Sequence, residues 1–416
     1  MTILIRSWAI AFCLVATANA APPNVLLIIG DDQGWTDFGF MGHPDVRTPH
    51  LDRLASQSAC FSRGYVPSSL CRPSLATLLT GKYPHQHGIT GNDPPMGTDR
   101  REMLQHVRRE ATLPKWLGQK GYASLQTGKW WEGNFAEGGF TAGMTHGDPS
   151  KGGRHGDDGL KIGRNGLKPI ADFLEATRDK PFFIWYAPMM PHTPHTPPER
   201  LLAKYQQPDR PLPIAKYYAM CEWFDETVGE LLGMLDQRGL ADNTLVVFVT
   251  DNGWIQQPNG NGFAPKSKRS PYDGGLRTPI LVRWPGRVSP AKFETPVSSL
   301  DIVPTIFAAT GVQPESPLPG LDLVEIAERG GKCDRKNLFG EIFSHDVADI
   351  TRPAASLQYR WTLRDGRWKL ILPHGSGDAE LYDVVADPFE TKNLAGEQPD
   401  RARALTADID RWWPAK

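Results

Sequence analysis

Hydrophobic residues along this chain fall into two alternating patterns, short uninterrupted apolar runs and longer segments with helical spacing. The uninterrupted runs predict strands that are buried on both faces, as in a parallel sheet; they are 24–29, 182–187, 244–249 and 280–284. The helical spacing, with proline near the start or glycine after the end, predicts amphipathic helices; these are 48–55, 73–79 and 222–238. The alternation predicts an α/β fold with a large mixed, mainly parallel sheet flanked by helices.

The pattern changes after about residue 335. Short strand-like pieces separated by turns, followed by a helix, predict a small antiparallel subdomain; they are 361–363, 368–372, 380–382 and 400–413. We therefore expect a main domain over 21–335 and a C-terminal subdomain over 336–416. The glycine-rich, polar segment 133–168 is expected to be a long surface loop that borders the functional site.

The first 20 residues predict a signal peptide. Arg6 precedes a small and apolar run at 8–16, and Ala18-Asn19-Ala20 matches a cleavage site. The mature chain would then begin near Ala21 and be secreted or periplasmic. The other interpretation of this segment is a buried N-terminal strand.

Composition narrows the class of protein. With 40% hydrophobic and 22% charged residues the chain is expected to fold, which excludes a disordered or fibrous protein. Its 46 Lys and Arg against 47 Asp and Glu lack the basic surplus of a nucleic-acid binder. No apolar run reaches the ~20 residues of a membrane helix. The four cysteines after residue 20 allow at most one disulfide; they are Cys60, Cys71, Cys221 and Cys333.

Pairs of oxygen ligands follow two of the predicted strands. Asp31-Asp32 comes after the run 24–29, and Asp251-Asn252 after the run 244–249. Ligands in α/β sheets bind beyond the carboxyl ends of the strands, and converging carboxylates repel one another unless a cation lies between them. All-oxygen ligation favours Ca²⁺ or Mg²⁺ over Zn²⁺. The alternative for each aspartate is a turn or a helix cap.

Cys71 precedes the helix that Pro73 is expected to open. A helix N-terminus lowers the pKa of a thiol, and the neighbouring Arg72 adds positive charge. Cys71 is therefore a candidate nucleophile or metal ligand. The alternative is a small buried hydrophobic residue.

Several segments form a recognisable series along the chain. They are 24–32, Cys71-Arg72-Pro73-Ser74 with Thr80-Gly81-Lys82, Gly128-Lys129-Trp130, 250–253, Lys268 with 272–275, 277–279, 380–383, Asp387-Pro388 and 393–395. Each segment alone is weakly specific. Together they span almost the whole mature sequence, and in their identity and order they resemble the sulfatase family.

This resemblance implies that a maturation enzyme oxidises Cys71 to formylglycine. One hydroxyl of the aldehyde hydrate attacks sulfur, and the other later collapses to the aldehyde and expels sulfate, which an ordinary alcohol could not do. It also implies one Ca²⁺, held by a set of ligands that includes the hydrated residue 71. The implied ligands are Asp31, Asp32, Cys71, Asp251 and Asn252.

The resemblance further assigns roles to three side chains. Lys129 and Lys268 match the sulfate-binding lysines, whose alternative is a solvated surface charge. His192 matches the histidine that aids the leaving oxygen, and its alternative is a structural loop histidine. The histidines without such a match are expected to be structural; they are His85, His87 and His195.

Two positions depart from the family pattern. Leu75 stands where the family normally has arginine, and Trp131 stands where it commonly has histidine. Arg72 could replace the lost positive charge, although its position beside Cys71 on a helix start is expected to point it elsewhere.

These residues predict a sulfuric-ester hydrolase that acts on a sulfated carbohydrate or an aryl sulfate. Two alternatives stay open: a phosphate- or phosphonate-monoester hydrolase on the same scaffold, and a non-catalytic binder of sulfated glycans. A thiol hydrolase built on Cys71 and His192 would leave the two carboxylate pairs unexplained.

Overall fold

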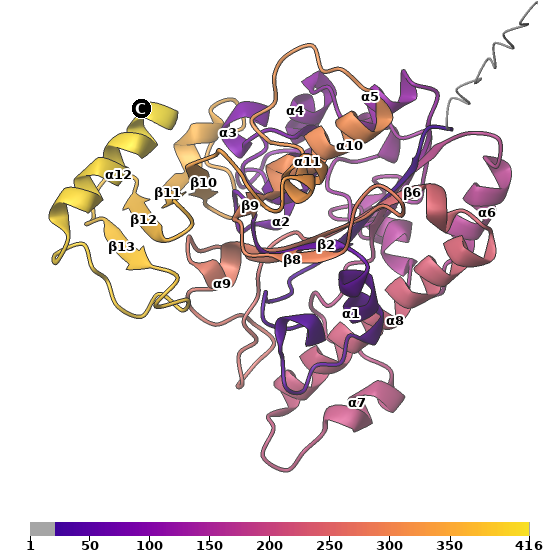
Figure 1. Ribbon diagram of the computed structural model, residues 1–416, viewed down its shortest axis with the longest axis horizontal. Helices are drawn as coiled ribbons and strands as arrows, with labels where there is room; N and C mark the ends of the chain where they lie inside the picture. The colour runs from indigo at the N-terminus through magenta and orange to yellow at the C-terminus, as the bar shows by residue number, and fades with distance from the viewer. Residues whose placement is uncertain (1–20, 416) are drawn as a thin grey trace, which may run out of the picture.

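The computed structural model describes residues 21–415, which form two separate sheets (Figure 1). The signal peptide predicted for residues 1–20 lies outside the described residues. The larger sheet consists of β1 (Asn24–Gly30), β2 (Ala59–Tyr65), β3 (Ala123–Gly128), β4 (Ala142–Gly143), β5 (Phe182–Ala187), β6 (Thr244–Thr250), β7 (Arg277–Arg283), β8 (Ala291–Phe293) and β9 (Val297–Ser298).

The order of the strands in the larger sheet is β4-β3-β5-β1-β6-β7-β2-β8, with β9 also paired to β2. Strand β7 is antiparallel to both of its neighbours, β6 and β2, and the other pairs are parallel. The prediction of a mixed, mainly parallel sheet is therefore confirmed.

Helices cover both faces of this sheet. They are α1 (Pro49–Ser56), α2 (Cys71–Thr80), α3 (Pro84–His87), α4 (Leu104–Arg109), α5 (Leu113–Gly118), α6 (Lys168–Ala176), α7 (Glu199–Tyr205), α8 (Leu212–Gln237), α9 (Asp273–Leu276), α10 (Ile302–Thr310), α11 (Leu323–Glu328) and, beside the second sheet, α12 (Pro399–Trp412). In Figure 1, α2, α10 and α11 lie on one side of the sheet, and α1 and α8 lie on the other.

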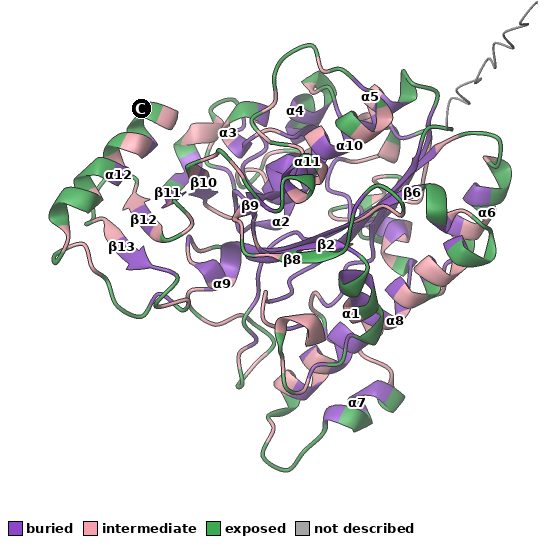
Figure 2. Cartoon of the chain, in the orientation of Figure 1, coloured by how far each residue is buried: buried purple, intermediate pink, exposed green. Residues whose placement is uncertain are grey.

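Alternation along β1 explains this layering. Val25, Leu27 and Ile29 pack into one core with residues of α2, α5 and α10, whereas Leu26 and Ile28 pack into a second core with residues of α1, α6 and α8. Side chains of a strand point alternately to opposite faces, so a strand covered on both faces is apolar throughout. Figure 2 shows most of the sheet as a buried layer between the helices, whereas the edge strand β8 is largely exposed.

Two helices begin earlier than the sequence pattern predicts. Helix α2 starts at Cys71 itself, so this cysteine is the first residue of the helix rather than the residue before it. Pro73 is tolerated because the first turn of a helix needs no backbone N–H donor. Gly81 ends the helix with a φ of 69°, as predicted. Helix α8 begins at Leu212, ten residues before the predicted start.

The second sheet contains four antiparallel strands, one more than predicted: β10 (Asn337–Phe343), β11 (Leu357–Arg364), β12 (Trp368–Pro373) and β13 (Glu380–Asp383). Helix α12 packs on it through Leu405 and Ile409, which contact Leu370 and Leu381. The small antiparallel sheet and the terminal helix are confirmed, and the division of the chain into domains at 335/336 stays a prediction.

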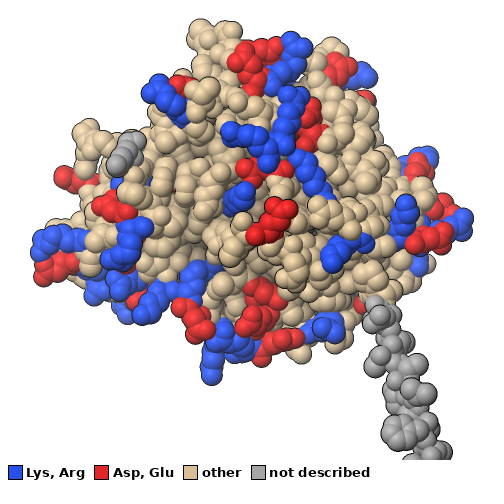
Figure 3. All heavy atoms as spheres, turned by 90° about the horizontal axis from the view of Figure 1, so that it is seen from above, with Lys and Arg blue, Asp and Glu red and all other residues tan. Residues whose placement is uncertain are grey.

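The surface drawn in Figure 3 carries basic and acidic side chains close to one another rather than one continuous basic patch. Within residues 21–415, no helix is long and apolar enough to cross a membrane. The four cysteines of this part of the chain are free thiols.

A buried ion network joins the second sheet to the first. Lys369 of β12 is fully buried and contacts Asp273 at 2.7 Å and Glu390 at 2.8 Å. The hydroxyl of Tyr65, in β2, donates to the other oxygen of Asp273 at 3.0 Å. Burial raises the pKa of Glu390, which Lys369 lowers in turn, and the pKa reaches about 7. One ammonium group is therefore shared by two buried carboxyl groups at the junction of the sheets, and the raised pKa of Glu390 reflects this shortage of positive charge.

Replacing Lys369 by methionine is expected to lower the free energy of unfolding by about 3–5 kcal/mol, because it leaves the buried carboxylate of Asp273 unpaired. Urea unfolding followed by circular dichroism measures this. The matched control is Lys392→Met, whose side chain is exposed and pairs with Glu397; it is expected to change stability by less than about 1 kcal/mol. Equal losses in the two variants would contradict the assigned role of Lys369.

Candidate active site

Four neighbouring strands of the large sheet, β3, β5, β1 and β6, are parallel and end at the same edge. Lys129 follows β3 directly, Asp31 follows β1, and Asp251 follows β6. His192 lies five residues beyond the end of β5. The topology therefore brings together side chains that are far apart in the sequence.

The carboxylates lie close to the cysteine and to each other. One ligand atom from each of four side chains lies within 4.8 Å of the other three; these are Asp31, Asp32, Cys71 and His192. The backbone N–H of Asp32 donates to Asp251 Oδ1 at 3.1 Å, and Asn252 Nδ2 donates to Asp32 Oδ1 at 2.7 Å. All five predicted calcium ligands thus lie in one group, and His192 joins them.

Both predicted lysines reach into this group. Lys129 Nζ lies 2.6 Å from Asp31 Oδ1 and 3.3 Å from Asp251 Oδ2, and Lys268 Nζ lies 2.6 Å from Asp32 Oδ1. The side chains of Lys129 and Lys268 are 1% and 8% exposed, so neither is a solvated surface charge. Three carboxylates against two ammonium groups would leave one excess negative charge if all of them were ionised.

The residues present fit a bound divalent cation. Asp31 Oδ2 and Asn252 Oδ1 are buried acceptors without a hydrogen-bond partner among the described residues. Burial and the negative charge of Asp31 raise the pKa of Asp251 to about 7, against the opposing charge of Lys129. The two lysines therefore do not fully offset the negative charge, and oxygen donors of this kind suit Ca²⁺ or Mg²⁺.

Local backbone geometry holds two of these side chains in place. Asp32 has a φ of 59°, a left-handed conformation that costs a residue other than glycine about 1–2 kcal/mol. Gly128 has a φ of 78°, and a Cβ there would lie 1.7 Å from the carbonyl oxygen of Ala187. Glycine is required at this position for Lys129 to turn into the site, where its N–H donates to the same carbonyl at 2.6 Å.

His192 lies at the opening of the site. Its side chain is 18% exposed, more than those of the lysines and carboxylates around it. Nδ1 donates to the carbonyl of Thr193 at 2.5 Å, and Nε2 lies 3.4 Å from Asp32 Oδ2. Burial lowers the pKa of His192, against the opposing charges of Asp31 and Asp32.

The expected low pKa of the Cys71 thiol is wrong. Burial raises this pKa to about 11, although Lys129 and Lys268 oppose the increase. Arg72 does not add charge there, because its guanidinium turns away and forms two hydrogen bonds to Glu132 at 2.6 and 2.7 Å. A buried thiol of this kind is a poor thiolate nucleophile, which argues against the thiol-hydrolase interpretation.

Three histidines without an assigned role have structural contacts. His85 Nδ1 lies 2.8 Å from Glu341, and its ring stacks on Trp413. His87 is fully buried and accepts the N–H of Ile89. His195 is also buried, and burial lowers its pKa to about 4.

Two residues beside the site have no signal in the sequence. Asn92 Oδ1 accepts the N–H of Arg72 at 3.0 Å and so holds the first turn of α2. His155, within the predicted surface loop 133–168, accepts the N–H of Trp130 through its carbonyl at 3.2 Å. These contacts join segments 20 or more residues apart, so no local pattern signals them.

Comparison with known proteins identifies the family. The family model described as Sulfatase matches residues 23–312. The chain belongs to the sulfatase family. A second model, described as N-sulphoglucosamine sulphohydrolase, C-terminal, matches residues 263–410 of this sulfatase. The protein is therefore a sulfuric-ester hydrolase.

Individual relatives agree with this assignment. The sulfatase is 30% identical to arylsulfatase A of Bos taurus, over 96% of this chain and 85% of that protein. It is 30% identical to N-acetylgalactosamine-6-sulfatase of Homo sapiens, over 77% of this chain and 68% of that protein. It also shares its fold, with a TM-score of 0.77 and 20% identity, with BT4656 in complex with its substrate D-glucosamine-2-N,6-O-disulfate; 95% of this chain and 98% of that chain are covered.

Proposed function

We propose that this sulfatase releases sulfate from a sulfated carbohydrate or an aryl sulfate, with Cys71 converted to formylglycine and one calcium ion bound. The observation that carries the proposal is the convergence of the carboxylate group, two buried lysines and His192 on Cys71 at one edge of the sheet. A structure of the same fold binds a sulfated glucosamine, which supports a carbohydrate substrate.

The charge of the site supports a divalent cation. With its carboxylates ionised, the group of Asp31, Asp32, Asp251, Lys129 and Lys268 has a net charge of −1 and would repel a sulfate monoester. A bound calcium would supply two positive charges and offset charge that develops on the sulfate. The carboxylate oxygens, the free amide oxygen of Asn252 and residue 71 would hold it.

The remaining side chains have separate tasks in this proposal. Formylglycine at position 71, as its hydrate, would supply the attacking hydroxyl and the internal route for releasing sulfate. Lys129 and Lys268 would donate hydrogen bonds to sulfate oxygens from a buried position, where such interactions are strongest. His192, fixed through Nδ1 and facing the opening, would act as the imidazolium, favoured by the charges of Asp31 and Asp32, and donate its Nε2 proton to the leaving oxygen.

Turnover of matched esters tests the proposal against its phosphate alternative. 4-Nitrophenyl sulfate, 4-nitrophenyl phosphate and a phenylphosphonate monoester are compared at equal concentration, with calcium present. We expect kcat/KM to be highest for the sulfate. A preference for the phosphate or the phosphonate would overturn the proposal and support the alternative hydrolase.

A second candidate function is the non-catalytic binding of sulfated glycans. It is favoured by Leu75, which is buried in an apolar core, and by Trp131, which cannot carry out acid–base chemistry. This candidate predicts sulfate-dependent binding without sulfate release after coexpression with the maturation enzyme. Ion chromatography of free sulfate separates it from the catalytic proposal.

Replacing Lys268 by alanine is expected to lower kcat by roughly 10²–10³, the usual cost of removing one donor to a developing charge. The fold is expected to survive, because calcium would continue to offset the charge of Asp32. Steady-state kinetics with 4-nitrophenyl sulfate measures the effect, and Lys292→Ala, at an exposed position of β8, is the control. Near-normal turnover in Lys268→Ala would contradict the assigned role.

The proposed location is secreted or periplasmic, based on the sequence of residues 1–20. N-terminal sequencing of the protein from its native source tests this, and a mature chain that begins near Ala21 is the expected result. A chain that retains Met1 would contradict export.

A further inference from the structure

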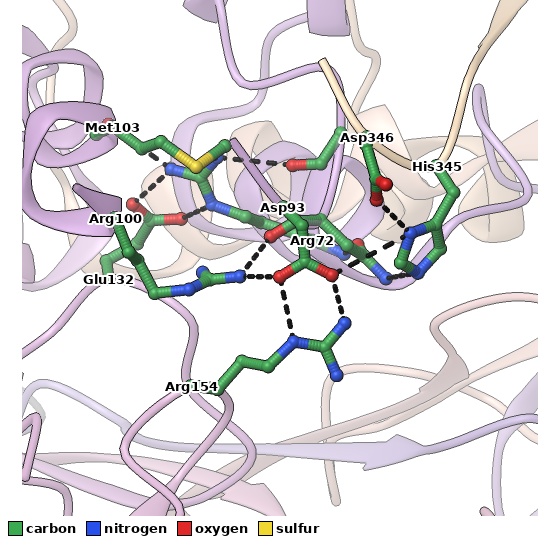
Figure 4. Close-up of polar contacts among 10 residues, drawn as sticks. Arg72, Asp93, Arg100, Met103, Glu132, Arg154, His345 and Asp346 are labelled. Atoms are coloured by element: carbon green, nitrogen blue, oxygen red, sulfur yellow. Dashed lines mark hydrogen bonds and ion pairs between the residues drawn. The ribbon is translucent and has the colours of Figure 1, made fainter. Parts of the chain in front are cut away.

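Beside the active site, one carboxylate is shared by three basic side chains (Figure 4). Asp93 accepts hydrogen bonds from Arg154, through Nε at 2.8 Å and through Nη2, and from Arg100 Nη2. His345 Nδ1 lies 3.7 Å from the same carboxylate. We call Arg100, Arg154 and His345, together with Asp93, the basic rim.

The basic rim carries more positive than negative charge. Partial burial alone would raise the pKa of Asp93, but hydrogen bonds from Arg154 and the charges of Arg154 and Arg100 lower it, so Asp93 stays ionised. It offsets only one of the two guanidinium charges. Asp346, 64% exposed, contacts His345, and its charge also raises the pKa of Arg154, so it offsets part of the remaining positive charge from the solvent side. Arg72, which is nearby in Figure 4, is already paired with Glu132.

Several donors of this region have no acceptor. Arg100 Nη1 and Trp131 Nε1 are buried and have no hydrogen-bond partner among the described residues. Arg154 uses Nε and Nη2 on Asp93, which leaves its Nη1 available, and its side chain is 46% exposed. A buried donor without an acceptor carries a free-energy cost. An incoming ligand with acceptor oxygens would remove this cost.

The ring of Trp131 packs against the guanidinium groups of Arg100 and Arg154 and is not open to the solvent. The guanidinium carbons of Arg100 and Arg154 lie 5.3 and 5.1 Å from the centre of its ring. The tryptophan is only 5% exposed, so it has no open face on which a sugar could stack. Cation–π contacts of this kind hold guanidinium groups in a fixed orientation.

Two chain segments of the basic rim, those of Asp93 and Arg154, are attached to the catalytic segments. Asn92, next to Asp93, accepts the N–H of Arg72 at 3.0 Å, directly after Cys71. His155, next to Arg154, accepts the N–H of Trp130 at 3.2 Å, directly after Lys129. The hydrogen bonds and charge of Asp93 raise the pKa of Arg154, against partial burial. Arg154 is therefore one residue away from a direct contact with the segment that carries Lys129.

A metal ion is a less suitable ligand for this region. Asp93, His345 and Asp346 do have ligand atoms within 4.8 Å of one another. However, the two arginines on Asp93 would repel a cation and already occupy both of its oxygens. The excess charge and the free donors favour an anion.

We propose that the basic rim binds a second anionic group of the substrate, a carboxylate or a further sulfate, on the sugar that carries the reacting sulfate or on its neighbour. This inference rests on the proposed function, since it assumes that a sulfated carbohydrate occupies the site at residue 71. Arg154 is the specificity-determining residue, because it combines an exposed guanidinium with a fixed orientation. Trp131 and Asp93 are positioning residues.

Equilibrium binding to the unconverted thiol form tests this proposal without turnover. The protein is produced without the maturation enzyme and titrated calorimetrically, with calcium present, with three sugars: galactose 6-sulfate, galactose 2,6-disulfate, and a disaccharide of galactose 6-sulfate and glucuronate. We expect at least one of the doubly anionic sugars to bind about tenfold more tightly than galactose 6-sulfate. Which of them does so distinguishes a second sulfate from a carboxylate.

Variants of Arg154 assign this preference to the basic rim. Arg154→Gln is expected to reduce the tenfold preference to twofold or less, whereas Arg154→Lys should keep part of it because the charge remains. Arg101→Gln is the matched control, since Arg101 is 86% exposed and pairs with Asp99. Three outcomes would overturn the proposal: equal affinities for all three sugars in the parent, no binding of any of them, or an equal loss for singly and doubly anionic sugars in Arg154→Gln.

Sulfate release by the converted enzyme is measured separately. No release, together with an Arg154-dependent binding preference, would contradict the catalytic proposal and leave the anionic subsite supported. Release of sulfate without an Arg154-dependent binding preference would support the catalytic proposal and contradict the anionic subsite. The two proposals therefore fail in distinguishable ways.

Discussion

Replacing Asp251 by alanine is expected to abolish calcium binding and sulfate release together. Asp251 contacts both Lys129 and the backbone of Asp32, and without it the remaining ligands would no longer balance a divalent cation. Calcium at 100 times its Kd is expected to stabilise the parent by about 2.7 kcal/mol, and the variant by a negligible amount. Thermal unfolding with calcium and with a chelator measures the difference.

Two further variants make this test specific. Asp251→Asn keeps the shape of the side chain and an oxygen for the N–H of Asp32, so it separates loss of charge from loss of packing. Asp225→Asn is the control, because Asp225 is a fully buried carboxyl in α8 that accepts the N–H of Leu51 away from the site. If Asp251→Ala still binds one calcium ion per chain, Asp251 is not a calcium ligand.

The strand-end pairs could be predicted from the sequence because each comes directly after an apolar run. Asp31 and Asp251 follow β1 and β6, whose last residues, Gly30 and Thr250, are in register in neighbouring parallel strands. Since ligands in α/β sheets lie beyond the carboxyl ends of the strands, the sequence predicts that the two aspartates lie at one edge of the sheet. Strand β2 could not be predicted this way, since Ser62, Arg63 and Gly64 interrupt its apolar run at the point where its register with β7 shifts.

That Arg72 turns away from Cys71 could be predicted from its position on the helix, but the pKa of Cys71 and the partner of Arg72 could not, because they depend on tertiary packing. Cys71 starts a helix, which favours a thiolate, yet its complete burial has the larger effect on its pKa. Arg72 turns away from Cys71 because Glu132, 60 residues later, offers a buried bidentate partner. The residues next to Cys71 and Arg72 in the sequence indicate neither this burial nor this partner.

Trp131 shows how a departure from a family pattern can be interpreted once its surroundings are known. In the sequence, Trp131 is recognised only as the replacement of a histidine that the family commonly has at this position. In the structure, its ring lies beneath two guanidinium groups that no local pattern connects, one from the segment before α4 and one from the loop 133–168. The substitution that removes an acid–base group thus also supports a basic surface beside the site.

Conversion of Cys71 to formylglycine is the prediction with the largest consequence, because the catalytic proposal requires it. We expect conversion despite Leu75, since the cysteine, Pro73 and the helix through Thr80 and Gly81 are intact. Mass spectrometry of the peptide that contains residue 71, after coexpression with the maturation enzyme, should show a species lighter than the thiol that reacts with hydrazines. Cys71→Ala is the control and is expected to release no sulfate above background.

Leu75→Arg tests whether the missing guanidinium limits maturation. If it does, the converted fraction should rise. The structure adds an opposing effect, since Leu75 is 5% exposed and packs in one core with Leu78 and Leu79, so that a new charge would be buried there without a partner. We therefore expect a lower melting temperature in Leu75→Arg, and Leu75→Met as the apolar control should change neither quantity. If Cys71 remains a free thiol in the parent and no sulfate ester is turned over, the catalytic proposal is wrong. The non-catalytic binding of sulfated glycans is then the supported function.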